Sequence, residues 1–140
     1  RRVITVAHLG AVAEKFAPGE SLLLRTGWFA SRGESAALPR RLSRIADDLA
    51  LWCVGKNVNV LGVEPPSVAD VNNKEELTRI HKILLGANVT IVEGLTNLDA
   101  LSQEKVFFVA APLKIEGGDG CPCRAFAFEG GMPMRLKGES

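Results

Sequence analysis

Short apolar runs, each bounded by turn residues, alternate along the chain with segments in which apolar residues recur at a helical period. Runs of this length are typical of strands, and most of them lack the polar alternation of a half-exposed strand, which predicts burial. The predicted strands are residues 21–25, 57–63, 88–92, 106–110 and 124–128. Strands that alternate with helices at this spacing indicate an α/β domain with at least partly parallel pairing.

Three segments between these runs are predicted to be helices. The first begins near Thr5 and ends at Pro18, the second runs from Leu42 to Gly55, and the third runs from Asn73 to Gly86. Each carries an apolar stripe at the i, i+3, i+4 spacing of a helix. In the third helix, Asn73 is followed three residues later by Glu76, which is the spacing of a capping box. A polar loop is expected between the first strand and the second helix, through Pro39.

The overall composition narrows the class of protein. Residues 1–140 have the length of a single domain, with 46% apolar and 24% charged residues, which excludes intrinsic disorder. The 17 basic and 16 acidic residues leave a net charge of +1, so charge gives no argument for binding nucleic acid or an anionic membrane surface. The longest stretch without charged residues, 3–13, is far shorter than the ~20 residues of a membrane span.

The three cysteines cannot form a closed disulfide framework, which favours a reducing compartment. We therefore expect a cytoplasmic protein, since no recognisable signal segment opens the sequence. A location in an organelle stays open, because the sequence begins at Arg1 and not at a methionine. Cys53 lies on the apolar stripe of its helix and is predicted to be a core residue. Cys121 and Cys123 are separated by one residue, whereas zinc-binding pairs are separated by two to four.

One pair of residues is a candidate site. His81 shares a helix face with three leucines, which suits either a hydrogen-bonded core histidine or a ligand. Glu93 directly follows the run 88–92, at the carboxyl end of a strand, where α/β folds bind ligands; the alternative is a solvated turn residue. A neutral imidazole and a carboxylate would together suit Zn²⁺ or Mn²⁺. Two ligands do not complete a metal site, so further ligands would have to come from elsewhere.

Several blocks of sequence resemble the cyclase family of metal-dependent hydrolases, which includes bacterial kynurenine formamidase and isatin hydrolase. The blocks occur in the order of the family and cover nearly the whole chain. They are 22–28 (LLLRTGW), 63–68 (VEPPSV), 81–85 (HKILL), 91–99 (IVEGLTNLD), 111–113 (APL) and 119–127 (DGCPCRAFA).

The resemblance implies an α/β fold around a mixed, partly parallel sheet with flanking helices, and a tendency to self-associate. It implies a divalent metal, zinc or manganese, and hydrolysis of a formamide or cyclic amide by metal-bound water, as in the arylformamidase step of tryptophan catabolism. By the same resemblance, His81 and Glu93 would be metal ligands. Glu93 would also be catalytic, by bridging metals or orienting the water.

The main metal motif of the family, His-x-Gly-Thr-His-x-Asp-x-Pro-x-His, does not occur in the sequence. His8-Leu9-Gly10 imitates its start, but Ala11 and Val12 stand at the next two positions. We therefore expect residues 1–140 to be the C-terminal portion of a cyclase-family domain, whose metal needs ligands from the missing N-terminal half. The complete parent would be an amidohydrolase, and this chain alone is expected to be inactive. The alternative is a non-catalytic remnant that serves as a structural or assembly subunit.

The same reasoning gives expectations about binding partners. A small-molecule amide would be the substrate of the parent. A family domain without its N-terminal half should expose apolar surface, so we expect a homo-oligomer or a partner subunit. We expect no nucleic acid and no membrane.

Overall fold

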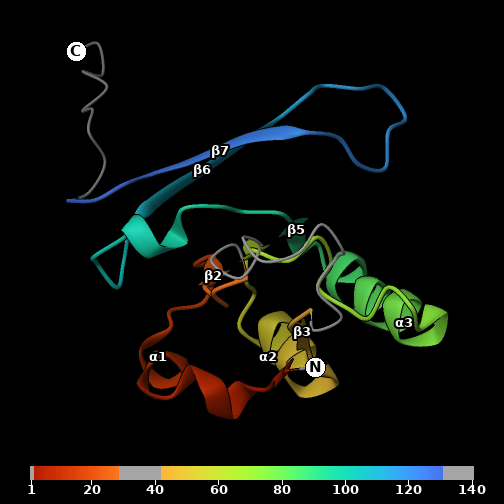
Figure 1. Ribbon diagram of the computed structural model, residues 1–140, viewed down its shortest axis with the longest axis horizontal. Coiled ribbons are helices and arrows are strands. Elements are labelled where there is room, and N and C mark those ends of the chain that lie inside the picture. The colour runs from red at the N-terminus through yellow and green to blue at the C-terminus, as the bar shows by residue number, and fades with distance from the viewer. Residues whose placement is uncertain (1, 29–41, 131–140) are drawn as a thin grey trace. The chain divides into compact units, whose positions relative to one another are not determined.

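Residues 2–28 and 42–130 are described in the computed structural model of the chain (Figure 1). Their contacts divide the chain into two compact units, Arg1–Leu98 and Asp99–Ser140. The predicted loop through Pro39 lies largely outside the described residues. That residues 1–140 form a single domain stays a prediction.

The described residues of the first unit form five strands, three α-helices and the 3-10 helix η1, and those of the second unit form a hairpin. In chain order the elements are β1 (Val3–Ile4), the 3-10 helix η1 (Val6–Leu9), α1 (Ala11–Lys15), β2 (Leu22–Leu24), β3 (Arg44–Ile45), α2 (Asp47–Gly55), β4 (Val60–Val63), α3 (Lys74–Gly86), β5 (Thr90–Val92), the 3-10 helix η3 (Leu98–Ala100), β6 (Phe107–Pro112) and β7 (Cys123–Phe128).

A parallel sheet lies at the centre of the first unit, with strand order β2-β4-β5. Leu61 of β4 is in register with Leu22 on one side and with Ile91 on the other. Parallel strands need long crossover connections, and α3 supplies the connection between β4 and β5 (Figure 1). With the antiparallel hairpin β6–β7, the described chain combines both kinds of pairing with helices, which confirms the predicted α/β class.

The hydrophobic core of this unit is formed by the sheet together with α2 and α3, which pack against each other. Leu61 of the sheet and Leu49 and Leu84 of the two helices are completely buried. Cys53 is also completely buried, which confirms its predicted place in the core. The carboxyl ends of the three strands are thereby fixed at one edge of the sheet.

The first predicted helix is wrong as a single element. Gly10, with φ 53° and ψ −133°, separates η1 from α1, because this backbone conformation does not continue a right-handed helix. Thr5 is the extended residue before η1, as predicted, and its backbone N–H donates to Nδ1 of His8 at 3.1 Å. The apolar spacing was helical, but periodicity does not detect a break at a glycine.

The second predicted helix begins later than expected, at Asp47 instead of Leu42. Arg44 and Ile45 form the short strand β3, which pairs in parallel with β1. The backbone N–H of Ile45 also donates to the carbonyl oxygen of Val68 at 2.8 Å. These long-range hydrogen bonds outweigh the local helical pattern. The helix ends at Gly55, as predicted.

The third predicted helix is confirmed as α3. The side chain of Asn73 accepts from the backbone N–H of Glu76 at 3.1 Å, which is one half of the predicted capping box. The Glu76 carboxylate accepts instead from the N–H of Asp70, at 3.1 Å, and pairs with Nε of Arg44 at 2.8 Å. This ion pair ties α3 to β3.

In the second unit, β6 and β7 form the two strands that the sequence predicted there, joined as an antiparallel hairpin. Phe107 is in register with Phe128, and Phe126 contacts Phe128 edge to face at 5.5 Å between ring centroids. All three aromatic side chains are exposed. Among the described residues, every helix is too short or too polar to cross a lipid bilayer.

Candidate functional site

His81 lies on α3, and its ring is oriented by the helix itself. Nδ1 lies 2.8 Å from the carbonyl oxygen of Leu77, one turn earlier. A carbonyl oxygen only accepts hydrogen bonds, so Nδ1 carries a proton, and the nitrogen that can present a lone pair to a metal is Nε2. The side chain is 29% exposed, so His81 is not the fully enclosed core histidine that helical facing alone would suggest.

Glu93 directly follows β5, at the carboxyl edge of the parallel sheet, where the sequence placed it. Its Oε1 accepts from the backbone N–H of Val68, at 3.0 Å, in the connection between β4 and α3. The side chain is 31% exposed and held by this long-range hydrogen bond. Glu93 is therefore anchored at the sheet edge, unlike a freely solvated turn residue.

The two side chains converge, with Nε2 of His81 3.6 Å from Oε1 of Glu93. This separation is longer than the ~2.7–3.2 Å of an N–H···O hydrogen bond. Two ligand atoms bound at ~2.1 Å to one tetrahedral zinc ion lie about 3.4 Å apart, so the observed distance fits a shared cation within a few tenths of an ångström. A backbone carbonyl behind the second ring nitrogen is also the usual arrangement of a metal-bound histidine.

The pair by itself does not complete a metal site. Among residues 2–28 and 42–130, no group of three or more histidine, cysteine, aspartate or glutamate side chains could hold a metal ion. Cys121 and Cys123 belong to the second unit, and Cys123 is part of strand β7 of the hairpin. The roles of His81 and Glu93 as ligands, and of Glu93 as a catalytic residue, stay predictions.

The structure adds one carboxylate that the sequence analysis did not select. Glu64 follows β4 as Glu93 follows β5, and its side chain is only 3% exposed. The signal was present, because Glu64 stands between the apolar strand and Pro65-Pro66, at the carboxyl end of a buried strand. Like Glu93, Glu64 stands at the end of the sheet where α/β folds bind ligands. The hydrogen bond from the N–H of Val68 to Glu93 could not be predicted from the sequence, because a backbone donor has no sequence signature.

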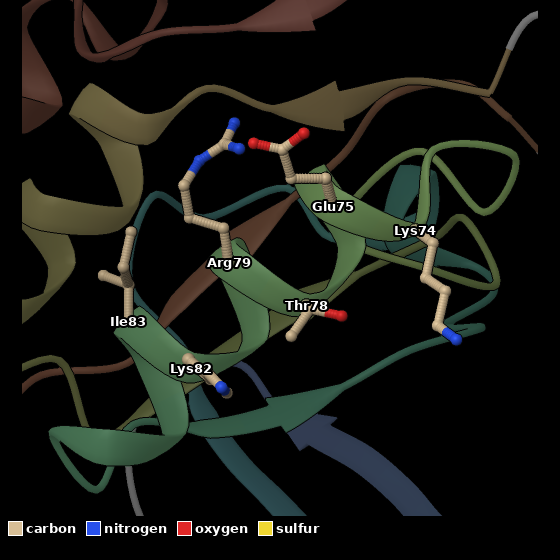
Figure 2. Close-up of a pocket in the computed structure, with 6 residues that line it drawn as sticks. All are labelled: Lys74, Glu75, Thr78, Arg79, Lys82 and Ile83. Atoms are coloured by element: carbon tan, nitrogen blue, oxygen red, sulfur yellow. The ribbon is translucent and has the colours of Figure 1, made fainter.

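An open hollow lies along the outer face of α3, and Figure 2 shows the side chains that line it. They are Lys74, Glu75, Thr78, Arg79, Lys82 and Ile83. Asp47 binds Arg79 through both carboxylate oxygens, at 2.9 and 3.2 Å, and this hydrogen bonding raises the pKa of the guanidinium. The hollow has mixed charge and includes neither His81 nor Glu93, so it is separate from the candidate site.

Comparison with curated proteins identifies relatives that are enzymes by name. The chain is 29% identical over 130 residues to the kynurenine formamidase of Bacillus cereus, covering 89% of this chain and 59% of that protein. It is 30% identical over 128 residues to the isatin hydrolase of Roseibium aggregatum, covering 78% of this chain and 44% of that protein. The chain thus spans less than two thirds of the length of these relatives.

Solved structures and a family model agree with these relatives. One structure, described as a potential metal-dependent hydrolase with cyclase activity, has a TM-score of 0.70 and 27% identity, covering 91% of this chain and 58% of that one. A second structure, described as a predicted metal-dependent hydrolase from Bacillus stearothermophilus, gives the same TM-score and identity, with 57% of that chain covered. The model of the Cyclase family matches residues 1–70, which are half of the chain. The chain therefore belongs to the cyclase family, as the resemblance of its sequence predicted.

Proposed function

We propose that this chain contributes part of the active site of a metal-dependent amide hydrolase. The observation that carries the proposal is the 3.6 Å separation between Nε2 of His81 and Oε1 of Glu93 at the carboxyl edge of the parallel sheet. Solved relatives described as metal-dependent hydrolases support a divalent metal. Zinc and manganese both accept this combination of imidazole and carboxylate.

Each of the two side chains has a definite task in this proposal. His81 offers the Nε2 lone pair because Leu77 holds the proton-bearing Nδ1. Glu93 offers negative charge from an oxygen whose position is fixed by Val68, and its second oxygen is available to orient a water molecule. The bound metal would lower the pKa of water toward ~7, so that hydroxide is available at neutral pH.

The substrate class we propose is a formamide or a cyclic amide. The relatives named kynurenine formamidase and isatin hydrolase support this class. Zinc or manganese as the metal, the place of the reaction in tryptophan catabolism, and the supply of further ligands by an N-terminal half are parts of the same proposal.

One observation favours a second candidate function. The described residues bring two potential ligands together, one fewer than the three protein ligands that catalytic zinc normally has, and this shortage is expected of a non-catalytic remnant. Such a remnant would serve as a structural or assembly subunit. The two candidates differ in whether metal binding depends on the His81–Glu93 pair.

We also propose that the chain self-associates or binds a partner subunit. Support comes from the hairpin unit, in which Phe107, Phe126 and Phe128 are exposed on one face, with Leu113 and Ile115 exposed nearby in the sequence. Exposed apolar clusters of this kind mark protein interfaces. Sedimentation velocity should show oligomers at micromolar concentration, and a well-behaved monomer would contradict this proposal.

A reducing, cytoplasmic location is proposed on the state of the cysteines. Cys53, Cys121 and Cys123 are all free thiols. Free thiols persist where glutathione keeps proteins reduced. Fractionation of expressing cells, followed by detection of the chain, tests the location.

Zinc binding by the 140-residue chain tests the function. We expect weak binding, with less than one zinc per chain retained after dialysis, because catalytic zinc normally has three protein ligands. Loss of a residue that only supports a metal ligand typically lowers metal affinity about 10- to 100-fold. Loss of a ligand itself should cost at least as much, so the zinc affinity measured by calorimetry should fall by at least ~10–100-fold in His81→Ala and in Glu93→Gln. Hydrolysis of a formanilide is measured on the same samples and is expected to be negligible.

Two matched variants control this experiment. His8→Ala removes the other of the two histidines, and Glu75→Gln removes an exposed carboxylate on α3. Both should bind zinc as the unmodified chain does. Stoichiometric zinc that survives in His81→Ala and in Glu93→Gln would refute the assigned site, and it would leave the assembly role as the better account.

A further inference from the structure

Glu64 is a buried carboxylate with an unusual set of partners. One oxygen, Oε2, accepts from the backbone N–H groups of Thr26, Gly27 and Trp28 at 2.6, 2.7 and 3.3 Å. The same oxygen accepts from the hydroxyl of Thr26 at 2.9 Å. These four donors are all neutral, so hydrogen bonds from the turn after β2 stabilise the buried carboxylate.

Three consecutive N–H groups that point at one anion form a backbone nest. Such a concavity requires a residue in the left-handed region, and Gly27 provides it with φ 73°. The carboxylate of Glu64 occupies the nest as an internal anion. Because the donors are successive backbone groups, the carboxylate fixes the conformation of the turn and not only its distance from β4.

Glu64 also lies between two hydrogen bonds that hold the end of β5. The carbonyl oxygens of its neighbours, Val63 and Pro65, accept from the N–H groups of Leu95 and Gly94, both at 3.0 Å. The main chain around Glu64 therefore fixes the residues that directly follow Glu93. The Glu64 side chain fixes the end of β2, on the opposite side of the central strand β4.

We propose that Glu64 is a positioning residue that holds the turn 26–28 at the same sheet edge as Glu93. This inference rests on the proposed function only in taking that edge as the site. Within the part of the chain that the structure describes, the carboxylate accepts hydrogen bonds only from the turn, so any effect of Glu64 on the site is exerted through the position of this turn. The three strand ends are thus joined through one residue of the central strand.

Amide hydrogen exchange of the full chain, followed residue by residue by NMR, tests the proposal without metal or substrate. Hydrogen bonds to a charged group contribute ~1.5–3 kcal/mol, and a factor of ten corresponds to ~1.4 kcal/mol. In Glu64→Ala, exchange at Thr26 and Gly27 should therefore accelerate by about 10- to 100-fold. Exchange at Trp28 should accelerate less, because its N–H also lies 3.3 Å from the hydroxyl of Thr26, which remains as an acceptor. Residues in the core of α3 should keep their protection, because the effect is local.

Refilling of the nest separates a positioning role from a general loss of stability. Formate is a carboxylate small enough to occupy the space left in Glu64→Ala, so added formate should restore slow exchange at the turn in a saturable way. Glu64→Gln retains an uncharged acceptor and should show an intermediate acceleration, which provides the test if Glu64→Ala does not fold. Ser67→Ala is the matched control, because Ser67 is also buried in the β4–α3 connection and binds only the N–H of Ala69 among the described residues.

Acceleration confined to the turn, with rescue by formate and no change in Ser67→Ala, would support the proposal. Unchanged exchange at the turn in both Glu64 variants, or equal acceleration throughout the chain, would overturn it. If stoichiometric zinc survives in His81→Ala and in Glu93→Gln, the proposed function fails while this test keeps its meaning, because exchange is read without metal.

Discussion

Replacement of Gly62 by alanine should destabilise the first unit at β4, the central strand of the parallel sheet. Gly62 lies within β4, in register with Leu23 on one side and Val92 on the other. A Cβ atom at this position would lie 2.5 Å from Cδ2 of Leu23 and 2.7 Å from Cδ1 of Leu95. Both distances are far below van der Waals contact, so both leucine side chains must move.

The magnitude follows from what can move. The crowded atoms are the ends of flexible side chains, and the nearest backbone atom, the carbonyl oxygen of Leu22, is 3.9 Å away. The strand can therefore survive, at the cost of about 1–3 kcal/mol that accompanies overpacking of a core. With roughly 3 °C per kcal/mol for a chain of this size, the melting temperature should fall by about 3 to 9 °C.

Gly86→Ala is the matched control for this prediction. Gly86 is the last residue of α3, a Cβ there meets no atom within 4 Å, and its backbone is not left-handed. The same chemical change should stabilise the chain by about 0.4–1 kcal/mol, because alanine restricts the unfolded state. Thermal and urea unfolding followed by circular dichroism measure both variants. If Gly62→Ala were as stable as Gly86→Ala, the close packing around Gly62 would be wrong.

Three further predictions concern single side chains. Burial raises the pKa of the Cys53 thiol to about 12, so this thiol should not react with an alkylating reagent in the native protein. Mass spectrometry should find Cys53 unmodified and the two hairpin cysteines modified. Equal labelling of all three cysteines would contradict the burial of Cys53. Hydrogen bonds from Gln103 and Ser102 lower the pKa of Glu129, so its stabilising effect is present above pH ~4.5 and is lost as the pH falls through that value toward the lower folded pKa. NMR of the hairpin between pH 6 and 3 should show this loss, and Glu129→Gln should abolish the pH dependence. Arg79→Gln removes an exposed ion pair that solvent and salt screen, so it should leave the free energy of unfolding nearly unchanged. A clear loss of stability in urea titrations would indicate a role beyond the pair with Asp47.

Local sequence determined which segments became the strands of the parallel sheet and of the hairpin, and where the third helix begins. The apolar runs at residues 22–24 and 60–63 form largely buried strands of the parallel sheet, as uninterrupted apolar residues predict, whereas β5 at the edge of the sheet buries only Val92. Asn73 begins α3 because its side chain replaces a missing acceptor within the same turn. These are effects between neighbours in the chain, and a pattern of neighbours is what the sequence displays.

Tertiary structure decided what depends on partners far away in the chain. Ile45 left a helical pattern to pair with β1 and Val68, and no local signal marks such a hydrogen bond. The sequence placed Glu93 at a strand end, but its 3.6 Å approach to His81 depends on how α3 packs and on the N–H of Val68. Glu64 carried the same strand-end signal and serves a different purpose, because its carboxylate meets the turn after β2. Residue type and spacing fix what a side chain can do, and the partner that the fold brings to it fixes what it does.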